Sequence, residues 1–198
     1  MWYAMQVKGG NENLVSQLCK ARFQGSLLNN CFYPKREIIR KERGERKVVM
    51  RTMFPGYLII DSDAIDELSR SLWQVPELTK VIKTGTTAIP IEGDEREFIE
   101  RHSDQNHVFR MSKGYMVGDF VKIEEGAFAG FYGRLLYVNR HNRFGVMKIH
   151  MFGKEMEIQF GLEIVHKIPS PTQPIHTQTP EVAGVGVFTE NAWHSYPY

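Results

Sequence analysis

Hydrophobic and polar positions alternate with two different periods along this chain, and these periods separate strands from helices. Residues 2–7 alternate around aromatic and apolar side chains, which predicts a strand at the start. Asn11 can then cap a helix over residues 12–24, which Gly25 ends. The expected apolar stripe of this helix consists of Leu14, Leu18 and Ala21.

The rest of the first 105 residues continues this mixture. Strands are expected over residues 27–33, 57–60 and 81–82, and a charged hairpin over residues 35–49 turns at 42–45. A second helix, capped by Ser62 or Asp63, ends at Pro76, and a third covers residues 94–101. The order β-α-β-β-α-β-α predicts an α+β domain over residues 1–105, with helices flanking an antiparallel sheet.

The second half carries strand signals alone. They cover residues 120–123, 134–138, 147–151, 156–160 and 162–165, which predicts a small five-stranded β-barrel over residues 115–168. Residues 106–114 are polar and aperiodic, as is typical of an interdomain linker. Residues 169–198 are rich in proline, threonine and glutamine, and they predict a disordered tail.

Charge changes this picture in one place. The net charge is only +2, but residues 35–51 hold eight basic and three acidic side chains. Such a segment favours contact with nucleic acid through phosphates, with little sequence information. The candidate contacts are Arg40, Lys41, Arg43, Arg46 and Lys47. The alternative is a solvated hairpin whose charges only confer solubility.

The sequence contains no recognisable catalytic or metal-binding motif. Cys19 and Cys31 form no CxxC pair, so neither a four-cysteine zinc site nor another cofactor is expected. Two thiols and no long apolar run favour a soluble cytoplasmic protein with no membrane contact. No P-loop, GxSxG or HExxH motif is present, and His102 and His107 are expected to be solvated. We therefore predict a protein that is not an enzyme.

The glycine-rich stretch over residues 117–131 joins a short strand to an aromatic loop, and it resembles a KOW motif. Such motifs form barrel modules in ribosomal proteins and transcription factors. An aromatic first strand, the basic hairpin and Phe54-Pro55-Gly56-Tyr57 precede it at family spacing. In this order they resemble the NusG family of transcription elongation factors over residues 1 to about 168. The resemblance implies an NGN-like first domain and an SH3-like KOW barrel.

Two departures from the housekeeping form resemble specialised paralogues, LoaP above all and RfaH more distantly. They are Gln6-Val7-Lys8-Gly9-Gly10 after the first strand and Phe160-Gly161-Leu162-Glu163-Ile164-Val165 in the last. LoaP-like proteins are processive antiterminators recruited through an RNA hairpin in the leader transcript. The RfaH resemblance would allow a helical form of the barrel, which its many glycines, such as those at 126, 130, 133, 145, 153 and 161, oppose.

The resemblance also implies binding sites. In this family the first domain binds the clamp helices of RNA polymerase, and Phe54 and Tyr57 match residues that border its apolar patch. Trp2 or Tyr3 would line the patch. The alternative is that these aromatics belong to the core of a small sheet. For Phe54 and Tyr57 we expect partial exposure, because Pro55-Gly56 interrupts the strand there.

In the barrel, basic groups interleaved with aromatics suit RNA loops, whose bases can stack on aromatic rings. The candidates are Arg134, Arg140, His141, Arg143, Lys148 and Lys154, and the turn over residues 139–143 is the preferred RNA contact. A solvated turn is the alternative. Phe131 could instead meet a protein partner.

The leading hypothesis is a monomeric transcription elongation and antitermination factor that binds RNA polymerase and an RNA hairpin or the nascent transcript. A housekeeping NusG-type factor, whose barrel binds a termination factor or a ribosomal protein, is the second. A KOW-containing ribosome-associated protein is the third.

Overall fold

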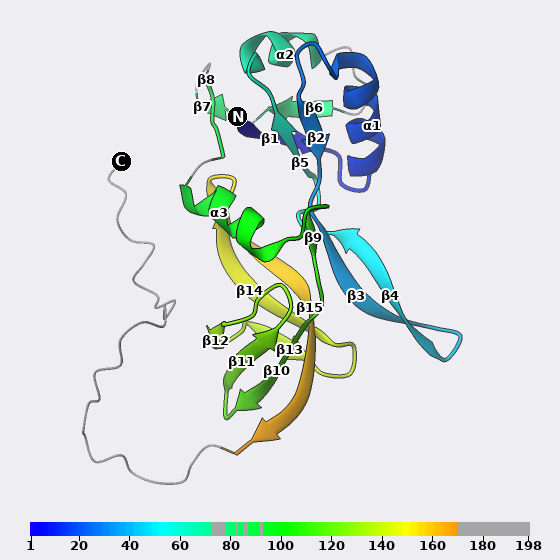
Figure 1. Ribbon diagram of the computed structural model, residues 1–198, viewed down its shortest axis with the longest axis vertical. Coiled ribbons are helices and arrows are strands. Elements are labelled where there is room, and N and C mark those ends of the chain that lie inside the picture. Colours follow the sequence, from blue (N-terminus) through cyan, green and yellow to red (C-terminus); the bar gives the residue numbers. More distant parts are fainter. Residues whose placement is uncertain (73–77, 82, 85–86, 92, 170–198) are drawn as a thin grey trace, which may run out of the picture.

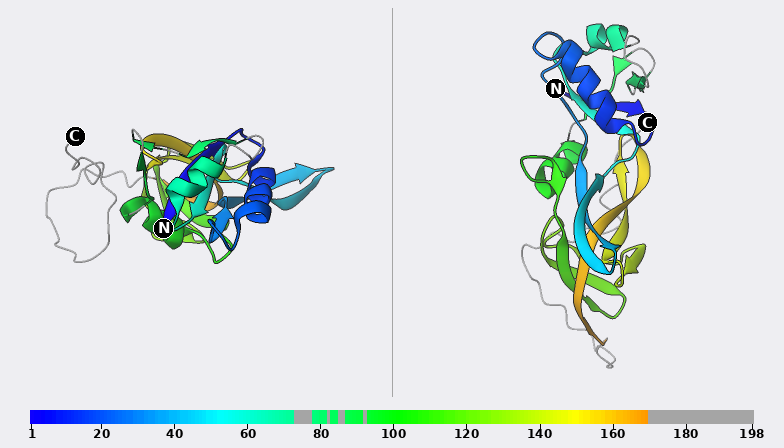
Figure 2. Two further views of the ribbon diagram at one scale, coloured as in Figure 1. Left: turned by 90° about the horizontal axis from the view of Figure 1, so that it is seen from above. Right: turned by 90° about the vertical axis from the view of Figure 1, so that its right-hand side faces the viewer.

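The computed structural model describes residues 1–72, 78–81, 83–84, 87–91 and 93–169. An N-terminal half with three helices lies at one end of an elongated molecule, and a β-rich half lies at the other (Figure 1). A long two-stranded hairpin projects sideways from their junction, as the view from above also shows (Figure 2). The predicted tail from residue 170 onward, Pro76 and Ile82 lie outside the described residues.

The N-terminal sheet has the strand order β2-β5-β1-β6, and all its pairs are antiparallel. Its strands are β1 (Trp2–Val7), β2 (Asn30–Phe32), β5 (Tyr57–Asp61) and β6 (Leu78–Val81). The helices are α1 (Glu12–Phe23), α2 (Ile65–Ser71) and α3 (Gly93–His102), and β7 (Lys83–Thr84) pairs with β8 (Thr87–Ala88). This confirms the predicted α+β class.

The buried stripe of α1 differs from the prediction. Val15, Cys19 and Phe23 face the sheet, whereas Leu14 is 48% exposed. The stripe is therefore shifted by one or two residues from Leu14, Leu18 and Ala21. Ser16 can join the buried face because its hydroxyl donates a hydrogen bond to the Cys31 carbonyl, at 2.9 Å.

The charged hairpin consists of β3 (Lys35–Glu42) and β4 (Glu45–Thr52), as predicted. Arg43 and Gly44 both have positive φ, 50° and 89°, which gives the tight turn that suits twisted two-stranded ribbons. At its base, β3 pairs in parallel with β9 (Val108–Phe109). The segment over 106–114, predicted as a linker, thus contains β9 and the start of the next strand.

The second half, here called the C-terminal sheet, has six strands rather than the expected five, in the order β12-β11-β10-β15-β14-β13. The strands are β10 (Ser112–Val117), β11 (Phe120–Glu125), β12 (Tyr132–Gly133), β13 (Tyr137–Asn139), β14 (Phe144–Met151) and β15 (Lys154–Ile168). Of the strand expected over 134–138, only residues 137–138 are in a strand, β13; residues 134–136 are not, and β12 ends before them. The two strands expected over 156–165 form one continuous strand, β15.

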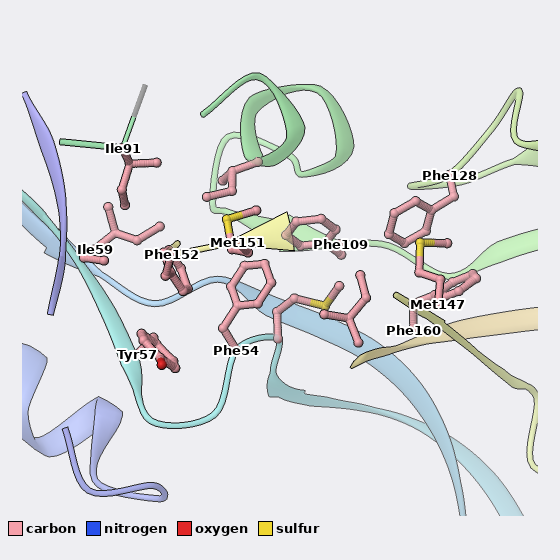
Figure 3. Packing of buried hydrophobic residues seen from close by; sticks show 14 of the residues in the cluster. Phe54, Tyr57, Ile59, Ile91, Phe109, Phe128, Met147, Met151, Phe152 and Phe160 are labelled. Carbon is pink, nitrogen blue, oxygen red and sulfur yellow. The ribbon is translucent and has the colours of Figure 1, made fainter. Parts of the chain in front are cut away.

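One hydrophobic cluster extends through both halves of the molecule. It joins Phe54, Tyr57 and Phe109 to Phe152 and Phe160 of the C-terminal sheet (Figure 3). The two halves are therefore docked on one another through buried side chains. Among the described residues, no helix is long and apolar enough to span a membrane.

Candidate functional site

The Phe54–Tyr57 loop lies where the two halves meet (Figure 3). Phe54 is 0% exposed and Tyr57 is 5% exposed, so the expected partial exposure is wrong. Phe152, at the tip of the β14–β15 hairpin, stacks on Tyr57 with ring centroids 4.7 Å apart and meets Phe54 edge-on at 5.3 Å. A side chain from the other half thus helps to cover the loop.

Hydrogen bonds to the N-terminal half fix this loop in place. The carboxylate of Glu12, which is buried, accepts bonds from the backbone N–H of Gly56 at 2.7 Å and of Gly10 at 3.0 Å. The Gln6 side chain donates to the Tyr57 hydroxyl at 3.1 Å. The sequence pattern does not indicate this role of Glu12. An acidic residue in the first turn of a helix is already explained by its favourable interaction with the helix dipole.

The tip of the covering hairpin has an unusual backbone. Phe152 and Gly153 have φ of 56° and 71°, and positive φ is uncommon for a bulky residue. Glu95 of α3 accepts a hydrogen bond from the Gly153 N–H at 3.2 Å. This turn points the Phe152 ring into the N-terminal half, where it is 7% exposed. Strain of this kind persists only where the surrounding contacts stabilise it.

Helix α3 forms a second contact between the halves. The His102 ring stacks on Phe128 at 5.0 Å between centroids, and its Nδ1 lies 2.7 Å from the Ala127 carbonyl oxygen. Because that oxygen can only accept, Nδ1 carries the proton. Burial lowers the pKa of His102, and it also lowers that of His107, which stacks on Phe32 at 3.7 Å. The expectation that both histidines are solvated is therefore wrong.

The pKa of His102 predicts a pH-dependent docking. In the docked form the pKa lies below its ordinary value of 6.5, which applies once the halves separate. Docking is then strongest above pH 6.5 and weakens as the pH falls through that value toward the lowered pKa, because protonation favours the separated form. Small-angle scattering should show a severalfold larger fraction of separated protein at pH 5.5 than at pH 7.5. His102→Gln, which can still donate to the Ala127 carbonyl, should remove most of this pH dependence. An unchanged pH profile would mean that another titrating group causes it.

The base of the hairpin forms a third contact, this time polar. Arg36 donates to the Gln159 carbonyl of β15 at 2.7 Å. Glu37 accepts bonds from Arg110 at 2.7 Å and from the Met111 N–H at 2.9 Å. Gly161 makes this close packing possible, because a Cβ there would lie 2.5 Å from the Glu37 carbonyl oxygen.

The first strand divides the two remaining polymerase candidates between opposite faces. Trp2 is half-buried beside the shared cluster, with its ring 5.2 Å from Phe32 and under the Arg96 guanidinium at 4.7 Å. Tyr3 is buried in a separate cluster with Met5 and Leu58. Trp2 therefore lies on the side of the Phe54–Tyr57 loop, and Tyr3 does not.

The basic candidates fall into two groups. All five hairpin residues are exposed; they are Arg40, Lys41, Arg43, Arg46 and Lys47. On the β13–β14 turn Arg140 and His141 are exposed, while Arg143 forms an ion pair with Glu163 at 2.9 Å. The structure brings Arg46 of the first group and the turn residues together around one open cavity.

Other candidates in the C-terminal sheet lie apart from that turn. The Arg134 guanidinium covers the Phe120 ring at 5.2 Å, and Lys148 pairs with Glu155 at 2.6 Å. Lys154 lies over Tyr57 at 5.0 Å, at the interface between the halves. Phe131 is half-buried and packs against the shared cluster. Among the described residues, no group of histidine, cysteine and carboxylate side chains could hold a metal ion.

The comparisons with known proteins identify the family. The model of the family described as "Transcription termination factor nusG" matches residues 1–100, just over half of the 198 residues. The chain belongs to the NusG family. Its members include transcription termination and antitermination factors, as the names of the relatives state.

Similar proteins cover most of the chain. The NusG protein of Thermus thermophilus is 26% identical over 179 residues, which is 84% of this chain and 97% of the relative. That of Haemophilus influenzae is 27% identical, over 83% of this chain and 94% of the relative. Both are named transcription termination/antitermination proteins. A solved structure described as "Domain interaction in Thermotoga maritima NusG" is 22% identical, covers 81% of this chain and 92% of its own, and has a TM-score of 0.50, which supports the NusG-like fold.

Proposed function

We propose that this NusG-family chain is a processive antitermination factor of the LoaP-like kind. Its N-terminal half binds the clamp helices of RNA polymerase, and its C-terminal sheet, the predicted KOW barrel, binds an RNA hairpin. The domain limits proposed from the sequence, 1–105 and 115–168 with 106–114 between them, are kept for this assignment. Family membership supports action on the transcription machinery.

The Phe54–Tyr57 loop supports the polymerase half of the proposal. It is apolar, it is held rigidly by Glu12 and Gln6, and it is covered by one hairpin tip. A preformed aromatic patch loses little entropy when it binds a helix pair. Because Phe152 occupies the patch in this structure, polymerase binding requires that the C-terminal sheet move away.

The exposed β13–β14 turn is the observation that carries the RNA half. Arg140 and His141 are solvent-exposed, and neither forms an ion pair with another described residue. Their donors are therefore available for phosphate oxygens and for the bases of a loop. Arg143 has a different role, since it has φ of 53°, pairs with Glu163, and its carbonyl accepts a bond from the Leu162 N–H.

A gel shift with structured leader RNAs tests the proposal. We expect one hairpin to bind tightly and Arg140→Ala to weaken that binding about tenfold, with the slope of log K against log salt reduced by about 1. Lys167→Ala, which removes an equal charge from the end of β15, is the control. Weak binding that is indifferent to sequence and disappears with salt would favour the housekeeping factor. Sedimentation with ribosomal subunits, and never with polymerase, would favour the ribosome-associated alternative.

A further inference from the structure

An open cavity of about 340 Å³ lies between the basic hairpin and the C-terminal sheet. Its lining comes from both halves of the molecule: Arg46 from β4, Arg140, His141 and Arg143 from the β13–β14 turn, and Glu163 and Ile164 from β15. Its volume is within the ~300–1,000 Å³ that small-molecule sites occupy. The two sets of basic residues that are separate in the sequence thus border one site.

The charges around the cavity favour an anion. Glu163, the one carboxylate in the lining, is already paired with Arg143 at 2.9 Å. Arg46 and Arg140 form no ion pair with any described residue. Two guanidinium groups, one from β4 and one from the β13–β14 turn, are therefore available to one ligand, and guanidinium matches the geometry of phosphate oxygens.

The lining also favours nucleic acid over a protein partner. Specific protein interfaces have an apolar, often aromatic centre surrounded by a polar rim. This cavity has one aliphatic side chain, Ile164, and no phenylalanine, tyrosine or tryptophan. The backbone of a nucleic acid, by contrast, presents phosphates at a spacing that a line of arginines can neutralise.

We propose that Arg46 and the Arg140–His141 turn together form a composite site for the phosphate backbone of RNA, present only while the two halves are docked. This inference rests on the proposed function, because it extends the RNA contact of the turn to the hairpin of the other half. Separation of the halves removes Arg46 from the site and leaves Arg140 and His141 in place.

The site links RNA binding to the arrangement of the halves. A ligand that contacts both halves stabilises the docked form by its differential affinity. In that form Phe152 covers the Phe54–Tyr57 loop. RNA at the composite site therefore lowers the affinity for polymerase through the docking equilibrium. By linkage, polymerase lowers the affinity of the composite site for RNA by the same factor. The factor would bind RNA most tightly while closed, and on polymerase engagement it would keep only the weaker RNA contact of the β13–β14 turn.

RNA affinity of the full chain and of hairpin variants tests the composite site. The probe is a synthetic RNA stem-loop, with the DNA stem-loop of the same sequence as a second arm. We expect Arg46→Ala to weaken RNA binding about fivefold to tenfold. Arg51→Ala is the matched control: it removes the same charge from an exposed position on the same strand, but its side chain does not line the cavity, and its effect should stay below about twofold. The DNA arm should bind more weakly than RNA.

The Phe152→Ala variant, which shifts the docking equilibrium toward the separated form, provides the decisive comparison. There the difference between Arg46→Ala and Arg51→Ala should shrink as the separated fraction rises, while Arg140→Ala should still weaken binding. Gly161→Ala, which separates the halves from a different contact, repeats the test should Phe152→Ala fail to fold. Equal losses from Arg46→Ala and Arg51→Ala in the docked chain would overturn the composite site and leave the RNA contact of the turn intact. If Arg140→Ala left the RNA affinity unchanged, the proposed RNA function itself would be overturned. If the DNA stem-loop bound as tightly as the RNA stem-loop, the choice of RNA would be overturned.

Discussion

Phe152→Ala should raise the affinity of this protein for RNA polymerase about 30-fold. The Phe152 ring stacks on Tyr57 and meets Phe54, so its removal takes away the aromatic contacts that close the patch. Truncation of a buried phenylalanine costs about 3–5 kcal/mol in a core, and about 2 kcal/mol is a cautious value at the tip of a hairpin. A loss of about 2 kcal/mol from docking raises the separated fraction about 30-fold. The apparent affinity of a site rises with the fraction that can bind.

The measurement is equilibrium binding to purified polymerase, with small-angle scattering to report docking. Phe120→Ala is the matched control, because it removes a phenylalanine that is 39% exposed in the same sheet. Adding Tyr57→Ala to the Phe152→Ala chain should lower the affinity again, since it truncates the uncovered patch. Separated halves with unchanged polymerase binding would contradict the assignment of the patch.

Local signals in the sequence predicted much of the fold. The turn at residues 42–45 was predictable because its chemistry is short-range: Gly44 readily takes positive φ, and β-branched runs flank the turn. The strand at residues 2–7 was predictable from its alternation. The stripe of α1 was not, because two overlapping apolar stripes were available and the choice between them depended on Cys31 and the sheet packed against the helix.

The candidate site was harder to predict, because its contacts join distant parts of the chain. The burial of Phe54 and Tyr57 depends on Phe152, and that of His102 depends on Phe128. No periodicity near Phe54 indicates which side chain will cover it. The meeting of Arg46 with Arg140 depends in the same way on how the halves dock. Basic composition could indicate both groups of residues, but not that they share a cavity.

The docked arrangement places different kinds of contact at different sites along the interface. Aromatic stacking closes the Phe54–Tyr57 loop, and the His102 ring joins α3 to the Ala127 carbonyl. At the hairpin base, side-chain hydrogen bonds join Arg36 to the Gln159 carbonyl of β15 and Glu37 to the Met111 N–H. The first contact is largely insensitive to salt and pH, whereas the second responds to pH. A single substitution can therefore weaken one of these contacts without changing the residues that form the others. Its effect on docking then reports the contribution of that contact.

Gly161→Ala should separate the halves from the opposite end of the interface. The new Cβ would lie 2.5 Å from the Glu37 carbonyl oxygen and would also meet the Met111 sulfur. The Met111 side chain can move aside, but the Glu37 oxygen belongs to the β3 backbone, which must shift away from β15. That shift stretches the Arg36–Gln159 and Glu37–Met111 hydrogen bonds, now 2.7 and 2.9 Å. Overpacking of this kind costs about 1–3 kcal/mol, or roughly 5- to 150-fold in the docking equilibrium.

Scattering and polymerase binding should report this change together, with Gly9→Ala as the control, because a Cβ at Gly9 meets nothing within 4 Å. A chain that stays docked would show that β3 yields without leaving β15. The double variant Phe152→Ala/Gly161→Ala makes the sharper test. Apparent affinity cannot rise further once every molecule is separated, so the double variant should bind polymerase only as tightly as the fully open form allows. If the affinity gains of the two substitutions multiplied beyond the value for the fully separated form, at least one substitution would be changing the polymerase-binding surface itself rather than the side chain that covers it.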